Sequence, residues 1–272
     1  MLVASTYAYF LIFAQFAFLS RLAERGLAAS AVQPVMAAMA LGGICTSLLA
    51  PLLTGRVKPG VAVRTGYALC AISALLTLLP FSITGALPIA FMIGAGLGML
   101  TVSLVAHLPV WCGVRHPILW VGAGTGLGYA FCNIPAVFNA SPAHQAIAAA
   151  VVCIVGFAFA TDAYAPLIER NRLEHVAIPR PLAITSFAAL VWLDSAAFYI
   201  IQHSATFKHE TWTGSTHLWT IASVHLAGAI VASILLSKRL LPLVLAAAVT
   251  SLGAACMLLT HGAGAYAASL LY

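Results

Sequence analysis

The feature that most constrains this chain is a series of long apolar runs, separated by short segments that contain charge, proline or glycine. A helix needs about 20 apolar residues to cross the hydrocarbon core of a bilayer. A run that begins at Ala263 reaches Tyr272, and nine earlier runs approach the full length. These nine cover residues 2–19, 32–53, 62–81, 86–108, 118–138, 146–168, 182–201, 218–236 and 240–259.

Lipid offers backbone N–H and C=O groups no hydrogen-bond partner, so a spanning segment is either a helix or a strand of a closed barrel. The alternation of apolar and polar residues that marks a barrel strand is absent from these runs. The sequence therefore predicts an all-α fold, a polytopic bundle of transmembrane helices, with the lipid bilayer as its first partner.

Composition excludes several other classes of protein. With 62% apolar and 7% charged residues, the chain lies far outside the range of soluble domains. The net charge of +6 is spread over short loops and is not gathered in one basic stretch, so no nucleic-acid partner is expected. The six cysteines lack the paired spacing of a zinc site or a disulfide framework. The first run has no basic segment before it, which argues against a cleaved signal peptide.

Basic residues are distributed unevenly between the two sets of loops. If the N-terminus is cytoplasmic, the outside loops hold only Arg21, Arg25 and Lys208 of the 12 Lys and Arg residues. Cytoplasmic loops of membrane proteins carry the excess of Lys and Arg. Arg21 and Arg25 alone give the opposite bias for the first helix, but four later loops agree with one another. The pattern predicts a multi-pass protein of the cell inner membrane with its N-terminus in the cytoplasm.

One polar loop divides the chain. Residues 169–181, ERNRLEHVAIPRP, combine five charges with two prolines and cannot form a span. They predict a cytoplasmic linker between an N-terminal six-helix bundle (1–168) and a C-terminal bundle (182–272).

A repeat relates these two parts. Leu41-x-Gly43 and the later Arg56 resemble Leu226-x-Gly228 and Arg239, about 185 residues further on. The copies have the same orientation, and parallel repeats of this kind build some transporters from two halves. Six helices are then followed by only three to four. We therefore expect an incomplete second half, either because the chain is a fragment or because partner subunits complete it.

This topology resembles that of the major facilitator superfamily, whose members have two six-helix halves, a cytoplasmic linker and a basic turn between helices two and three. The family's turn reads Gly, three residues, Asp, Arg, one residue, Gly and two basic residues. Here Arg56 and Gly60 match, Arg64 follows, and Gly55 stands in place of the Asp. In helix four, Gly96-Leu97-Gly98 fits the family, but Met92 stands in place of an Arg, which argues against a simple proton antiporter.

The fifth apolar run contains four glycines at every second position, of which Gly124 and Gly128 are four residues apart, followed by Pro135. Small residues at this spacing let transmembrane helices approach closely. Antiporters of the family have a helix five rich in Gly and Pro. We interpret the glycines as packing positions, with an antiporter role as the alternative. A phosphate loop is excluded, since no strand precedes them and no Lys-Ser or Lys-Thr follows.

Two ionisable residues are placed deep in the membrane. Asp194 in the seventh run and His225 in the eighth are about ten residues from the external loop that joins these runs, which at 1.5 Å per residue gives them similar depths. A carboxylate in the bilayer persists only where it faces a cavity or a partner. We hypothesise that the two residues pair in a central cavity and bind a proton or a cationic group of the solute. The alternatives are a structural hydrogen bond and no contact.

Three uncharged polar residues also lie at membrane depth: Gln15, Asn133 and Tyr199. In the family, helices one, four, seven and ten line the path, so the resemblance implies that Gln15 and Tyr199 touch the solute. A hydrogen bond between helices is the competing interpretation. The external histidines match no closed metal site, so no metal and no cofactor are expected.

The sequence contains no Ser-His-Asp constellation on loops, no paired carboxylates and no nucleotide motif, so an enzyme is not expected. The leading hypothesis is a secondary active transporter that moves a small-molecule solute by alternating access, with proton coupling as an option. The alternative is a non-transporting structural or assembly subunit of a larger membrane complex with the same fold.

Overall fold

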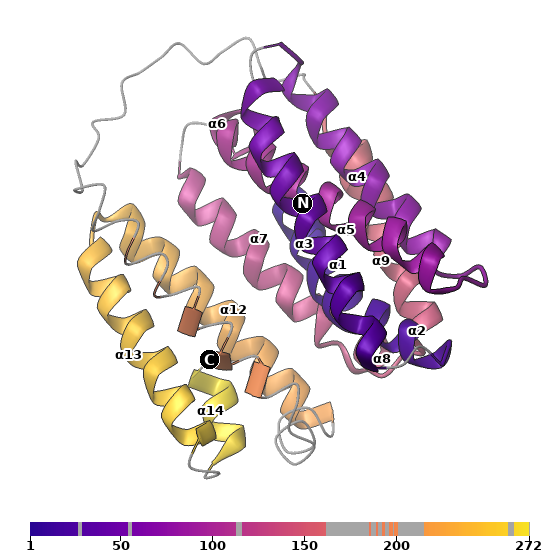
Figure 1. Cartoon of the computed structure of the whole chain (residues 1–272). Helices are drawn as coiled ribbons and strands as arrows, with labels where there is room; N and C mark the ends of the chain where they lie inside the picture. The colour runs from indigo at the N-terminus through magenta and orange to yellow at the C-terminus, as the bar shows by residue number, and fades with distance from the viewer. Residues whose placement is uncertain are drawn as a thin grey trace.

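The computed structural model describes residues 1–26, 29–53, 56–112, 116–161, 215–260 and 264–271, with isolated positions between 185 and 200. Its elements are helices (Figure 1). The first polypeptide span is formed by α1 (Leu2–Tyr9), the π-helix η1 (Phe10–Ala17) and α2 (Phe18–Glu24). The others are α3 (Ala29–Leu53), α4 (Pro59–Leu76), α5 (Ile83–Ala106), α6 (Leu108–Cys112), α7 (Pro117–Cys132), α8 (Pro135–Phe138), α9 (Pro142–Phe159), α12 (Ser215–Ser237), α13 (Leu241–Thr260) and α14 (Ala265–Leu271).

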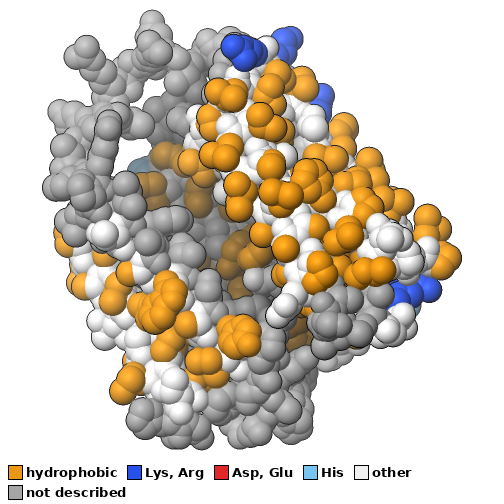
Figure 2. All heavy atoms as spheres, viewed as in Figure 1, with side chains coloured by type: hydrophobic (Ala, Val, Ile, Leu, Met, Phe, Trp, Pro, Cys, Tyr) orange, Lys and Arg blue, Asp and Glu red, His pale blue; other side chains and the backbone are white. Residues whose placement is uncertain are grey.

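Within the described residues, 7 helical segments are long and apolar enough to cross a membrane. Their outer faces carry large apolar side chains: along α3, Leu41, Ile44 and Leu48 are each more than half exposed. Figure 2 shows apolar side chains over much of the visible surface. Such a surface is unfavourable in water and suits lipid. The prediction of an all-helical, multi-pass membrane protein is confirmed at this level.

Two predicted spans are interrupted. The apolar run 118–138 was expected to be one helix, but α7 ends at Cys132 and the short α8 begins at Pro135. Proline has no N–H to donate and disfavours the α conformation of the residue before it, so Ile134 is extended (φ −60°, ψ 121°). The expected helix 146–168 likewise ends at Phe159, because the backbone of Ala160 leaves the helical region (ψ 68°).

The N-terminal helices enclose a core that includes a few polar side chains. Tyr9 and Ser73 share a hydrogen bond of 2.8 Å between their hydroxyl groups, and the Tyr67 hydroxyl donates to the Leu2 carbonyl oxygen at 2.6 Å. These bonds join α1 to α4. The hydroxyl groups of Tyr9, Ser73 and Tyr67 therefore each have a partner, which lipid would not supply.

Helices α3 and α5 lie in close contact because glycines face each other across the interface. A Cβ atom added at Gly94 would overlap the carbonyl oxygen of Met39, and one at Gly42 would overlap that of Phe91. A Cβ at Gly98 would lie 2.6 Å from the Gly43 carbonyl oxygen. Backbone thus rests on backbone, as in other transmembrane contacts made by small residues.

The helix contacts also place the charged turns. Arg21 donates to the Thr77 carbonyl oxygen (2.8 Å) and Arg25 to that of Leu79 (3.1 Å), so the turns after α2 and α4 share one end of the bundle. Helix α3 leads from that end to Arg56 and Lys58 at the other.

The C-terminal helices extend this arrangement. Helix α12 runs antiparallel to α7, since Gly122 faces Ser233 and Tyr129 faces His225. Helix α5 starts at the Arg21 end and leads to the Arg56 end, where α7 begins and runs back. Because α12 is antiparallel to α7, it ends at the Arg56 end, and Lys238 and Arg239 lie there. The two repeat-related helices differ in partner, because α3 packs on α5 whereas α12 packs on α7. The predicted linker 169–181 lies outside the described residues.

Gly94→Ala tests the α3–α5 contact. The added methyl group would overlap the Met39 carbonyl oxygen, so we expect a loss of about 1–3 kcal/mol or more in unfolding free energy. Thermal unfolding of the purified protein in detergent measures the effect. Gly253→Ala in α13 is the matched control, because nothing lies within 4 Å of its new Cβ. Equal melting temperatures for the two variants would contradict the packing.

Cysteine labelling tests the placement of the turns. Lys58, Lys238 and Ser82 are exposed, and each is replaced singly by Cys. We expect Lys58→Cys and Lys238→Cys to react with a membrane-impermeant maleimide only in permeabilised cells, and Ser82→Cys in intact cells, each above the rate of the unsubstituted protein. Reaction of Lys58→Cys and Lys238→Cys from opposite sides would contradict the fold. If Lys58→Cys and Lys238→Cys reacted in intact cells and Ser82→Cys only in permeabilised cells, only the predicted orientation would be contradicted.

Candidate functional site

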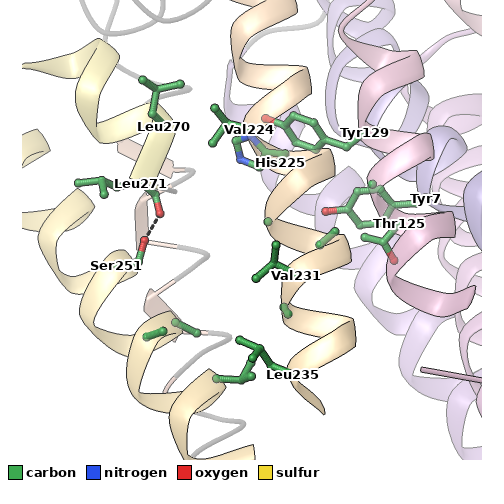
Figure 3. Close-up of a pocket in the computed structure, with 17 residues that line it drawn as sticks. Tyr7, Thr125, Tyr129, Val224, His225, Val231, Leu235, Ser251, Leu270 and Leu271 are labelled. Atoms are coloured by element: carbon green, nitrogen blue, oxygen red, sulfur yellow. Dashed lines mark hydrogen bonds between the residues drawn. The ribbon is translucent and has the colours of Figure 1, made fainter. Parts of the chain in front are cut away.

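A groove of about 480 Å³ runs along α12, between α1 and α7 on one side and α13 and α14 on the other (Figure 3). Its walls are mostly small or apolar, and its hydrogen-bonding side chains come from four helices. These are Tyr7 of α1, Thr125 and Tyr129 of α7, His225 of α12 and Ser251 of α13. Cavities of this size accommodate small organic molecules.

The glycines of α7 explain why the groove lies here. On one face of α7, a Cβ at Gly122 would overlap the Ser233 hydroxyl oxygen, and one at Gly126 would lie 2.8 Å from Leu226 Cδ1. On the other face, a Cβ at Gly124 would lie 2.8 Å from Val3 Cβ. Residues four apart share a face of a helix, so glycines at every second position make two narrow faces. Helix α7 therefore contacts α1 and α12 at once.

Tyr129 and His225 form a stacked pair in the groove wall. Their rings are stacked, with centroids 4.1 Å apart and planes 14° from parallel. The His225 Nδ1 lies 2.8 Å from the Ile221 carbonyl oxygen. A carbonyl oxygen only accepts, so Nδ1 carries the hydrogen, and the imidazole is held in one orientation. Figure 3 shows the stacked pair across the α7–α12 contact, with Tyr7 and Thr125 below it.

The far wall is built from α13 and the end of α14. The Ser251 hydroxyl donates to the Leu271 carbonyl oxygen, which ties the two helices together. Between the walls, α12 contributes small residues, among them Gly228 and Ala229. Among the described residues, no atom from outside the neighbouring backbone of α12 lies within 4 Å of a Cβ built at Gly228. The groove is therefore open at this position.

The residues predicted from sequence lie in different places. His225 lines the groove, whereas Asp194 lies outside the described residues, so their pairing stays a prediction. Gln15 lies in η1, and its Oε1 atom is buried. Asn133 ends α7, where its Nδ2 donates to the Tyr129 carbonyl oxygen at 2.9 Å. Tyr199 is 61% exposed, and of these five residues only His225 is among the described residues that line the groove.

The residues of the basic turn lie away from the groove. Gly55 is outside the described residues, Arg56 is exposed, and Gly60 is buried at the start of α4. The Arg64 guanidinium carbon lies 5.6 Å from the centroid of the Phe157 ring in α9, in a cation–π contact. Among the described residues, no three His, Cys, Asp or Glu side chains are grouped so that they could hold a metal ion.

Sequence reasoning missed Tyr7, Thr125, Tyr129 and Ser251. Apolar runs alone do not indicate which face of a helix meets a neighbour, because lipid and protein select similar side chains. A signal was present for Tyr129, which directly follows the glycine series in α7. No comparable signal distinguishes Tyr7 from the other aromatic residues of its helix.

Comparison of the chain with protein-family models, with curated proteins and with solved structures found no match.

A double-mutant cycle tests the stacked pair. We expect Tyr129→Leu and His225→Gln, measured singly and together by unfolding in detergent, to show a coupling energy of about 0.5–1.5 kcal/mol, the range for stacked rings. His217 stacks on Tyr266 near the start of α12, so the cycle between Tyr129→Leu and His217→Gln is a matched control that should be additive. Additive effects in the first cycle would contradict the stack.

Proposed function

We propose that this chain is a secondary active transporter that moves a small solute across the membrane by alternating access, with the groove beside α12 as its solute site. The observation that carries the proposal is the groove itself. It combines about 480 Å³ of space with hydroxyl and imidazole groups in a chain that is otherwise strongly apolar. Polar side chains inside a membrane are costly and mark solute or ion pathways.

The position of the groove supports this use. It lies where the N-terminal helices meet α12, α13 and α14, and transporters built from two halves bind their solutes between the halves. We infer a major-facilitator-like arrangement, in which residues 1–168 and 182–272 belong to the two halves. Rocking of one helix group against the other would then expose the groove to each side of the membrane in turn.

The contact between α7 and α12 suits such a motion. Glycines at this contact remove the interlocking side chains that would resist sliding or tilting of one helix on the other. Tyr129 and His225 meet through their ring faces, and such a contact can separate and form again as the helices move. These features support α7 and α12 as the surfaces that move against each other.

The driving ion is a separate part of the proposal. Among the described residues that line the groove, His225 is the one whose side chain changes charge near neutral pH. We propose that it takes part in proton coupling, together with Asp194 if the two residues pair. The basic ends of α3 and α12 support a cytoplasmic N-terminus in the cell inner membrane.

Filling the groove tests the proposal. A panel of small solutes is first screened for uptake into vesicles that contain the purified protein, with and without a pH gradient. The uptake rate of each solute that accumulates is then measured with two variants. We expect Gly228→Leu, which adds a side chain inside the groove, to lower uptake by about tenfold or more. Gly253→Leu should leave uptake near the original rate, since this α13 glycine is outside the groove lining and has nothing within 4 Å of its Cβ.

Two results would contradict transport through this site. Equal uptake by both variants would exclude the groove as the solute path. Absence of uptake for every solute, from correctly oriented and folded protein, would instead favour the non-transporting assembly subunit. Co-purification of partner subunits from the native membrane would then support that alternative.

A further inference from the structure

The chemistry of the groove lining restricts what it can bind. Of the 17 described residues around the groove, none is Asp, Glu, Lys or Arg. Burying an ionised group in apolar surroundings without an opposite charge is strongly unfavourable. While His225 is neutral, the described walls therefore disfavour an anion, such as a carboxylate or phosphate, and also a cation.

The shape of the walls favours a flat molecule. The rings of Tyr129 and His225 are nearly parallel. The groove is also lined by Gly126, Gly228 and Ala229, whose side chains are absent or small. Aromatic rings gain from offset-stacked and edge-to-face contacts with other planar rings. A planar solute can lie along the small residues and place its edge or face against the ring pair.

The polar groups of the groove are few and all lie on hydroxyl or imidazole side chains, from Tyr7, Thr125, Tyr129, His225 and Ser251. The Thr125 and Ser251 hydroxyls donate to the carbonyl oxygens of Val121 and Leu271, and His225 Nδ1 donates to that of Ile221. This inventory satisfies one or two polar groups on a solute. A sugar, whose many hydroxyl groups would each need a partner on burial, fits it poorly.

We propose that the groove takes an uncharged, planar ring compound that carries one or two hydrogen-bonding groups. This inference rests on the proposed function, since it names the solute class of the same site. In this assignment any proton moved by the chain is shared between His225 and Asp194, if the two residues pair, and the solute itself is neutral. Tyr129 is the residue that selects the planar ring, and the uncharged walls select the neutral form.

Four probes of similar size test the inference by equilibrium binding to the purified full chain. Benzamide is neutral and planar, benzoate and benzylammonium carry charges of opposite sign, and cyclohexanecarboxamide is neutral but not planar. The signal measured with Gly228→Leu, whose groove is filled, is subtracted from that of the unsubstituted protein to correct for partitioning of the probe into detergent. The control variant Gly253→Leu should bind the probes as the unsubstituted protein does. We expect benzamide to bind about tenfold or more tightly than either charged probe, and about threefold or more tightly than cyclohexanecarboxamide.

Variants of Tyr129 distinguish a loss of the preference for planar probes from a loss of folding. Tyr129→Leu should make benzamide and cyclohexanecarboxamide bind alike while both charged probes stay weak, and Tyr129→Phe should restore the preference for benzamide. The inference would be overturned if a charged probe bound as tightly as benzamide or more tightly, or if benzamide showed no preference over cyclohexanecarboxamide. It would also be overturned if Gly228→Leu did not reduce the binding of benzamide. The uptake comparison of Gly228→Leu with Gly253→Leu decides the transport proposal separately, so the solute class can fail while transport stands.

Discussion

The close approach of α7 to two helices at once is the interaction on which the candidate site depends. A membrane supplies little hydrophobic force to press helices together, so contact is achieved where side chains are small enough for backbones to meet. Glycines at every second position give α7 two such faces, with Gly124 and Gly128 toward α1 and Gly122 and Gly126 toward α12. With a larger residue on either face, α12 and α1 could not both lie against α7.

This contact also determines where the groove opens. Because α12 is pressed against α7 at Gly122 and Gly126, the ring of His225 meets that of Tyr129 one turn further along. Beyond the contact, α13 and α14 lie on the other side of α12, and the space between the two walls is not filled by the small residues of α12. The same small residues that allow the helices to meet thus leave room for a solute beside them.

The sequence was sufficient for seven of the nine predicted spans and insufficient for most of the site. Spans such as α3 and α13 follow from physics that acts on each segment alone, because a run of apolar residues in lipid must be helical. The break at Pro135 was also readable in principle, since proline disfavours helix in the preceding residue, but the apolar run across it concealed the end of α7. The lining of the groove depends on which faces meet, and Tyr7 and Ser251 differ from lipid-facing positions only through that packing. His225 was identified because an ionisable residue in a span is conspicuous without any structure.

The way the helix groups are held together differs from what the family resemblance implies. In that family, an Asp in the turn between helices two and three takes part in charge contacts that lock the halves, and here Gly55 replaces it. Of the basic residues near this turn, Arg56 is exposed and Arg64 lies over the Phe157 ring. Among the described residues the one ion pair, Arg21 with Glu24, is local to α2. Where the described helices of the two groups meet, at α7 and α12, the contacts are glycine faces and an aromatic stack. Such contacts depend on shape, and salt screens them far less than it screens exposed charges, so the strength of the α7–α12 contact depends mainly on packing.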